Sequence, residues 1–237
     1  MKISMDRKNV LPLLLIAAGF ALASVPGARG QPAAAATNGL VPLLIKLPDP
    51  SFVITPRDPT PGSDVEPVSK EPRPPLMVPK DVKNIAPSAK ITCSDPNATP
   101  DALGKITDGN KEAVDSNIVL LRKGAQWVQF DLGAEQEIYA IVVWHAHDAP
   151  KVYHGVVIQV SDDAGFTNNV TTLFNNDVAN KAGRGAGTDR EYVETNQGKL
   201  IDAKGIKARY ARLYSSGNTE GVMNEYTEVE IYARPAK

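Results

Sequence analysis

The sequence predicts an all-β protein made of antiparallel strands, either a sandwich or a barrel. Beyond residue 81, short runs rich in Val, Ile, Tyr, Phe and Trp recur, and Gly, Asp, Asn or Ser bound them, as is typical of strands. No stretch after the N-terminal apolar segment keeps a helical apolar period over about ten residues. The connections are polar, which favours antiparallel pairing. Residues 81–237 are numerous enough to bury one core.

The net charge and the cysteine count narrow the kinds of partner and cross-link that the chain can have. The chain has 237 residues, a formal net charge of −1 and a pI of about 6.3. No strongly basic face is therefore expected, and no nucleic-acid partner. Cys93 is the single cysteine, which excludes an intrachain disulfide. We expect a buried thiol there, with a reactive or intermolecular thiol as the alternative.

Residues 1–30 have the order of a secretory signal peptide. Basic residues come first, the mostly apolar run 11–23 follows, and small residues with a turn end the segment. We expect cleavage before Gln31, with cleavage after Ala23 or a retained N-terminal anchor as alternatives. The run is short for a membrane span and no second one follows. The mature protein is therefore predicted to be secreted or periplasmic, with no membrane span after signal cleavage.

Residues 31–80 are predicted to form a Pro/Ala-rich extended arm or linker. Eleven of the nineteen prolines lie between Pro42 and Pro79, and proline excludes helix interiors and central strands. Such a segment favours polyproline-like conformations and acts as a semi-rigid spacer. The stretches 40–48 and 51–56 are too apolar for a plain solvated linker, so we expect part of the arm to lie along a domain face.

The strand candidates then follow in order: residues 126–133, 137–145, 152–163, 170–176, 209–216 and 227–233. Side chains alternate along a strand, so Ala211 and Leu213 share one face, expected to be the inner one. Arg212 lies on the other face, where a solvated charge is expected. Trp127, within an apolar run, is expected to pack. Residues 175–205 are rich in Asn, Asp and Gly and predict an extended loop region.

Seven motifs in order carry a family resemblance. They are NIAPSAKITCSD (84–95), ITDGN (106–110), WVQFDLG (127–133), IYAIVVW (138–144), VVIQVSDD (156–163), ARYARLYS (208–215) and NEYTEVEIYA (224–233). Together they resemble the discoidin domain, also called the coagulation factor V/VIII type C domain, whose group includes carbohydrate-binding module family 32. The resemblance implies an eight-stranded jelly-roll β-sandwich of the galactose-binding-like kind over residues 81–237, with ligand loops at one end.

The same resemblance implies a structural calcium ion. Many family members bind it with an Asp-Gly loop and a carboxylate near the last strand, which correspond here to Asp108 and Glu228. Asn110 supplies a further oxygen, and calcium prefers several oxygen ligands. The chain departs from the family at Ala113, where Thr or Ser is frequent. The alternative is that Asp108 belongs only to a turn and Glu228 only to a surface strand.

The stretch 141–163 holds all three histidines, and its role is open among three interpretations. In the first, the histidines are structural or edge residues. In the second, His145 and His147 share a strand face and meet His154 across a hairpin. With Asp148, that arrangement would suit a zinc site.

In the third interpretation the stretch binds a ligand. Trp144 and Tyr153 supply aromatic faces for the apolar side of a sugar ring, and the three histidines supply polar contacts to its hydroxyl groups. Trp144 is open between this role and a place in the core.

No nucleophile elbow, His-Glu-x-x-His motif or phosphate loop is present in the sequence. The sequence therefore predicts an exported, non-catalytic recognition module that binds carbohydrate or another cell-surface ligand through loops at one end. Two alternatives remain. One is a structural or adhesion subunit whose arm docks on an exported protein partner. The other is a metal-dependent hydrolase that uses the His145/His147/His154 cluster.

Overall fold

A computed structural model describes residues 39–53, 64–69 and 72–237. The predicted signal peptide, residues 1–30, lies outside the described residues, as does part of the predicted arm. Within the described residues, no helix is long and apolar enough to cross a bilayer.

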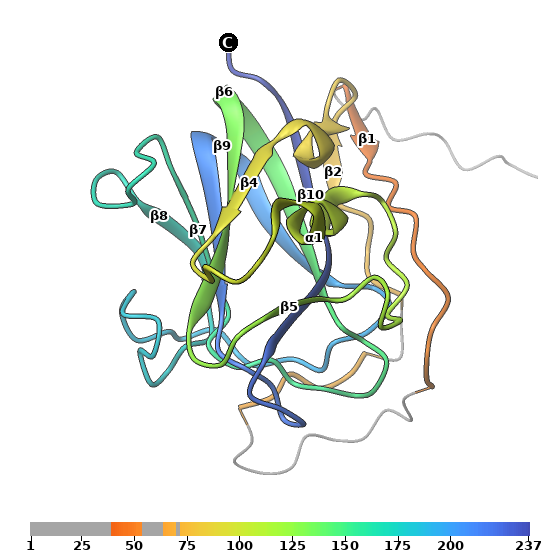
Figure 1. Cartoon of the computed structure of the whole chain (residues 1–237). Helices are drawn as coiled ribbons and strands as arrows, with labels where there is room; N and C mark the ends of the chain where they lie inside the picture. The colour runs from red at the N-terminus through yellow and green to blue at the C-terminus, as the bar shows by residue number, and fades with distance from the viewer. Residues whose placement is uncertain (1–38, 54–63, 70–71) are drawn as a thin grey trace, which may run out of the picture. The chain divides into compact units, whose positions relative to one another are not determined.

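The fold is mostly antiparallel β-sheet, as the sequence predicts (Figure 1). One sheet runs in the order β3 (Lys83–Asn84), β10 (Asn224–Pro235), β6 (Gln126–His145), β9 (Lys199–Ser215), β7 (Val157–Ser161) and β8 (Thr171–Asn175). Two further strands join it: β4 (Lys90–Cys93) pairs with β6, and β5 (Val119–Leu121) with β10. Strands β1 (Leu40–Pro42) and β2 (Met77–Pro79) form a separate pair. The pairing of these strands agrees with the antiparallel sandwich that the sequence predicts.

Short helical segments connect the first strands. They are η1 (Ala86–Ser88), α1 (Pro100–Gly104) and η2 (Lys105–Thr107). Helix α1 begins with Pro100 in its first turn and Thr99 as N-cap, whose side chain accepts a hydrogen bond from the Ala102 amide. This segment leads into the Asp-Gly loop.

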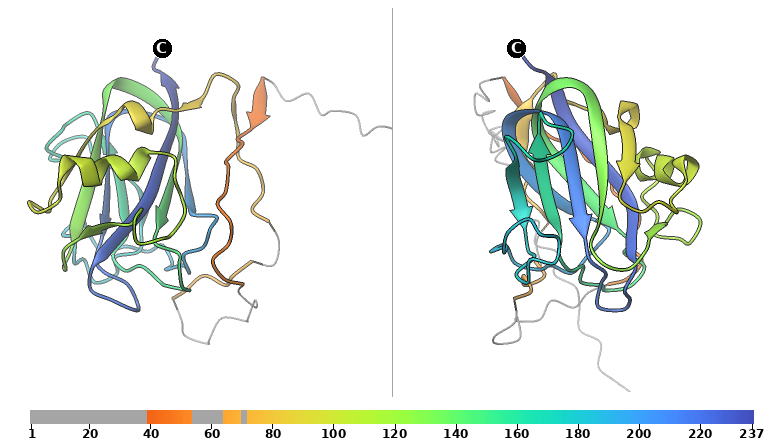
Figure 2. Two further views of the ribbon diagram at one scale, coloured as in Figure 1. Left: turned by 45° about the vertical axis from the view of Figure 1, so that its right-hand side comes forward. Right: turned by 60° about the vertical axis from the view of Figure 1, so that its left-hand side comes forward.

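Strands β6 and β9 bend and return to the end of the molecule from which they start (Figure 2). The β6–β9 register shifts between Asp131 and Gln136, and Gly133 has a φ of 81° there, which glycine adopts without strain. The two halves of β6 therefore lie in different layers of the sandwich.

The two strands predicted at residues 126–133 and 137–145 are the two halves of this one bent strand. Residues 199–205, predicted as loop, are the first part of β9.

The two layers enclose one apolar core. Val128 comes from the first half of β6 and Val143 from the second, and both are fully buried. Ala211 and Leu213 face this core, as predicted. The predicted solvated charge at Arg212 is wrong, since that residue is 8% exposed. The guanidinium can be buried because oxygen atoms around it accept its hydrogen bonds.

The partners of Arg212 explain its burial. Its guanidinium lies 4.4 Å from the ring centroid of Trp127 and 4.2 Å from that of Phe166. It also donates hydrogen bonds to the side-chain oxygen of Gln129 at 2.7 Å and to the carbonyl of Ala164 at 3.0 Å. Trp127 is half-buried and packs against this cation, a favourable arrangement.

The described parts of the arm cover the outer face of β6 and β10. A second apolar cluster on that face consists of Ala140, Val142, Trp144 and Tyr232. Leu43, Ile45 and Leu76 of the arm pack against it, and the Leu43 amide donates to the Leu76 carbonyl at 2.7 Å. The arm descends beside the sandwich in the left view of Figure 2. Both faces of this half of β6 are apolar, so the outer one is stable only under a cover.

Candidate functional site

The ends of three long strands meet at one end of the sandwich. Strand β6 ends at His145, β9 starts at Lys199 and ends at Ser215, and β10 starts at Asn224. The connecting segments 146–156, 176–198 and 216–223 therefore gather there, at the bottom of Figure 1. We call this region the loop end.

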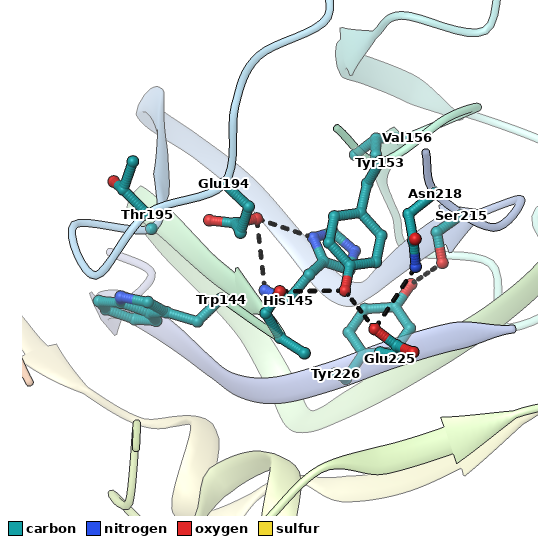
Figure 3. Close-up of polar contacts among 12 residues, drawn as sticks. Trp144, His145, Tyr153, Val156, Glu194, Thr195, Ser215, Asn218, Glu225 and Tyr226 are labelled. Carbon is teal, nitrogen blue, oxygen red and sulfur yellow. Dashed lines mark hydrogen bonds and ion pairs between the residues drawn. The ribbon is translucent and has the colours of Figure 1, made fainter. Parts of the chain in front are cut away.

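A buried layer of aromatic and polar side chains lies under the loop end (Figure 3). The His145 ring stacks on Tyr153, with centroids 4.3 Å apart, and lies 4.8 Å from the ring of Tyr226. His145 Nδ1 is 3.1 Å from a carboxylate oxygen of Glu194, and each side chain is 1% exposed. These contacts fix the imidazole from several sides.

Glu225 joins the buried layer to the surface. The Tyr153 hydroxyl lies 2.8 Å from Glu225 Oε2, and the Lys151 ammonium lies 2.9 Å from the same oxygen. Asn218 donates to it at 3.4 Å. Burial, followed by the charge of Glu225, raises the pKa of Tyr153 far above its usual range. Tyr153 therefore remains a neutral hydroxyl that holds the carboxylate in place.

A half-exposed layer lies above. His154 Nδ1 is 2.7 Å from Glu191 Oε1, and the two side chains are 35% and 24% exposed. The backbone of His154 is fixed by hydrogen bonds with Gly217 at 3.0 Å and Ser216 at 2.8 Å. Gly155 follows with a φ of 59°, which suits glycine. His154 and Glu191 thus form a surface pair on a rigid base.

The structure separates the five predicted ligand residues. Trp144, His145, His147 and Tyr153 are at most 1% exposed, and only His154 reaches the surface. The Trp144 indole donates to the Asn196 carbonyl at 3.0 Å, and its ring lies 5.0 Å from the Lys111 ammonium. Both rings predicted to contact a ligand are therefore buried: arm residues pack against the cluster that holds Trp144, and Tyr153 lies in the main core against His145.

The three histidines do not converge. His147 Nε2 lies 2.9 Å from the Lys111 carbonyl, whereas His145 and His154 pair with different glutamates. Among residues 39–53, 64–69 and 72–237, no group of three or more His, Cys, Asp or Glu side chains could hold a metal ion. Strand β6 ends at His145, so the alternation that would put His147 on the same face stops there. The structure therefore does not bring together the three histidines on which the hydrolase hypothesis rests.

The predicted calcium ligands lie on two segments that meet. The Gly109 amide donates to Glu228 Oε2 at 3.2 Å, and the Asp108 carboxylate accepts from the Asn110 amide at 2.8 Å. Glu228 is fully buried, and burial raises its pKa to about 8. Its Oε1 atom has no hydrogen-bond partner within the described chain. A buried, unpartnered carboxylate oxygen beside a loop fits a cation, although Lys111 also lies near and pairs with Glu230 at 2.8 Å.

Comparison with known proteins gives a family match for part of the chain. Residues 105–213 match a model of the F5/F8 type C group described as NedA-like, galactose-binding domain. The chain contains a discoidin-like domain. No curated protein matches it by sequence.

Solved structures with similar folds include several sugar-binding modules. The family 32 module of AlyQ, in complex with 4,5-unsaturated mannuronic acid, is 21% identical, with a TM-score of 0.44 over 60% of this chain and 92% of that one. A Streptococcus pneumoniae fucose binding module, SpX-3, is 20% identical, with a TM-score of 0.45 over 63% and 97%. Chitosan-binding module 1 of a Paenibacillus sp. IK-5 chitosanase/glucanase is 21% identical, with a TM-score of 0.44 over 63% and 98%.

Sequence reasoning missed the acidic partners in the discoidin-like domain. Glu191 and Glu194 lie in a segment that reads only as polar loop, and Glu225 precedes a strand as an ordinary polar residue. Their pairing with histidines and Tyr153 joins residues 37 to 72 positions apart. The one signal was the density of charged residues at 189–194, which does not identify partners.

Proposed function

We propose that this discoidin-like domain is an exported, non-catalytic recognition module that binds carbohydrate through the loop end. The observation that carries the proposal is the half-exposed His154–Glu191 pair on its rigid, hydrogen-bonded base. Sugar hydroxyls are both donors and acceptors, and their recognition needs a few polar groups held in fixed positions. The family match to a galactose-binding domain supports the same function.

The chemistry of the loop end suits hydroxyl groups. Glu191 and Asp148 offer carboxylate oxygens, and the buried Asn218 donates its amide to Glu225. Hydrogen bonds to charged groups are the stronger kind, and each side chain already has a partner that limits its rotation. Less side-chain entropy is therefore lost when a ligand binds.

A glycan-array screen of the full purified protein tests this function. We expect binding to a defined sugar class, and we expect His154→Ala and Glu191→Gln each to weaken it about tenfold or more. Glu135→Gln is the matched control, because Glu135 is exposed and lies at the register shift between Asp131 and Gln136, in the middle of β6. A blank array with folded protein would overturn the proposal.

A blank array would favour the structural or adhesion role instead. The arm presents Leu44 and Val53, which are 86% and 93% exposed, and exposed apolar side chains on one segment are frequent at protein interfaces. The partner would be another exported protein.

We also propose that calcium supports the fold near the loop end, held by Asp108, Asn110 and Glu228. The unpartnered oxygen of Glu228 supports this, since a divalent cation would neutralise a buried charge. The ion would stabilise the junction of the Asp-Gly loop with β10 and would take no part in a reaction.

A further inference from the structure

The segment 190–199 lacks the regular hydrogen bonds of a strand or helix over most of its length. Its backbone contacts with the sandwich include an antiparallel bridge between Val193 and Val152, a hydrogen bond from the Glu194 amide to the Lys151 carbonyl at 2.8 Å, and the bond from the Trp144 indole to the Asn196 carbonyl. Backbone groups in such a segment need partners from elsewhere. Several of those partners come from the arm.

The arm binds this segment along its length. Val65 forms a parallel bridge with Glu191, and the Glu66 amide donates to the Glu191 carbonyl at 2.6 Å. The Lys199 ammonium lies 2.8 and 2.9 Å from the two carboxylate oxygens of Glu66. Asn196 donates to the carbonyl of Pro48 at 2.9 Å.

Arg73 is the anchor at the turn that closes the segment. Its guanidinium donates to the carbonyl of Gly198 at 3.0 Å and to that of Gln197 at 3.1 Å. A planar, charged donor that holds two successive carbonyls restricts position and orientation together. Gly198 lies against the Trp144 ring, since a Cβ added at this position would come within 2.6 Å of that ring.

The opposite side of the same segment holds the histidines of the loop end. The carboxylate of Glu191 pairs with His154 at 2.7 Å, and that of Glu194 pairs with His145 at 3.1 Å. Glu191 is therefore bound twice, through its carbonyl by the arm and through its carboxylate by His154.

From this geometry we infer that Glu66 and Arg73 are positioning residues for the loop end. They hold residues 190–199 so that Glu191 orients the His154 ring. The effect on a ligand rests on the proposed function, whereas the effect on His154 does not. The arm is then part of the recognition site's support, although neither residue touches the ligand.

Nuclear magnetic resonance of the His154 ring tests the inference without any ligand. We expect the ring nitrogen shifts of His154 in the double variant Glu66→Ala/Arg73→Ala to move toward those of Glu191→Gln, because both changes weaken the same hydrogen bond. Arg73→Lys keeps the positive charge but lacks the two guanidinium donors that bind both carbonyls. Its His154 shifts should therefore lie between those of the original protein and those of the double variant. Arg209→Ala, which breaks a comparable ion pair with Asp131 on the outer surface away from the arm, should leave His154 unchanged.

The second readout is affinity for the sugar found on the array, expected to fall about tenfold in the double variant. Unchanged His154 shifts in the double variant would overturn the inference. If the double variant fails to fold, Arg73→Lys and Glu66→Gln decide the outcome by the same shifts. If no sugar binds but the shifts move, the positioning role stands and the proposed function alone fails.

Discussion

Glu228 is the residue whose chemistry depends most on its surroundings. It is fully buried on β10 and its pKa is raised from 4.5 to about 8 by burial. The folded protein therefore keeps a proton there that the unfolded chain releases above about pH 4.5. The associated stability is fully present below that pH and is lost as the pH rises toward 8.

Glu228→Gln keeps the shape and removes the charge. In chelator, we expect the variant to gain stability relative to the original protein between pH 5 and pH 8, by at most roughly 1.4 kcal/mol per pH unit. Urea unfolding at a series of pH values measures the difference. Parallel pH profiles would contradict the buried, protonated state.

Calcium should stabilise the folded protein through the ionised form of the Glu228 carboxylate. We expect added calcium to raise the melting temperature of the original protein at pH 8 and to leave Glu228→Gln unchanged, because the ion needs the carboxylate. Calorimetry with and without chelator measures this. Asp131→Asn, at a carboxylate on the outer face of the sheet, is the control and should keep the response to calcium. An equal response of Glu228→Gln and the original protein would exclude Glu228 as a ligand.

At the scale of elements, the loop 162–169 acts as a small rigid cover on the outer sheet face. The Asp163 carboxylate accepts hydrogen bonds from the amides of Gly165 at 2.8 Å and of Thr167 and Asn168 at 3.0 Å. A hydrogen bond from the Thr167 hydroxyl at 2.6 Å, together with these amide bonds, holds the pKa of Asp163 well below its usual range. The loop places Phe166, with a φ of 54°, on the Arg212 guanidinium.

Phe166→Ala should destabilise the protein by roughly 3 kcal/mol, because it removes a buried ring and one face of the cation contact. Urea unfolding measures the change. Leu120→Ala is the control, since Leu120 is 55% exposed and should cost less than about 0.5 kcal/mol. Similar losses in the two variants would show that the loop does not pack on Arg212 in solution.

At the scale of the whole molecule, the arm and the sandwich share a core. A fragment of residues 81–237 would expose the outer cluster around Trp144. We expect it to be less stable than the full chain, on the order of 3 kcal/mol, with Trp144 emission shifted to the red. Denaturant unfolding and fluorescence of the two proteins measure this. A fragment as stable as the full chain would mean that the arm only rests on the surface.

The sequence was sufficient for the architecture because strands carry local signals. The β-branched and aromatic runs predicted β7, β8 and β10 within a few residues, and the alternation at Ala211 and Leu213 gave the inner face. The bends of β6 and β9 were missed, because a polar turn and a bend that keeps pairing look alike in sequence.

The site was less predictable because its contacts are long-range. His154 was a candidate, but its partner Glu191 lies 37 positions away. Trp144 suited a core position better than a sugar contact, but the sequence left both roles open. Its burial depends on arm residues about 100 positions earlier, and no local pattern shows which segment will cover a given face.

The returning course of β6 and β9 has a consequence for how the protein can be attached to a surface. The chain ends at Lys237, at the end of the sandwich opposite the connecting segments (Figure 1), where its carbonyl accepts from Lys207 at 2.7 Å. A tether joined at Lys237 would therefore leave His154 pointing away from the support. Linkage through lysines of the arm would instead attach the protein beside its candidate site. In an assay with immobilised protein, we therefore expect stronger ligand binding when the protein is attached through Lys237.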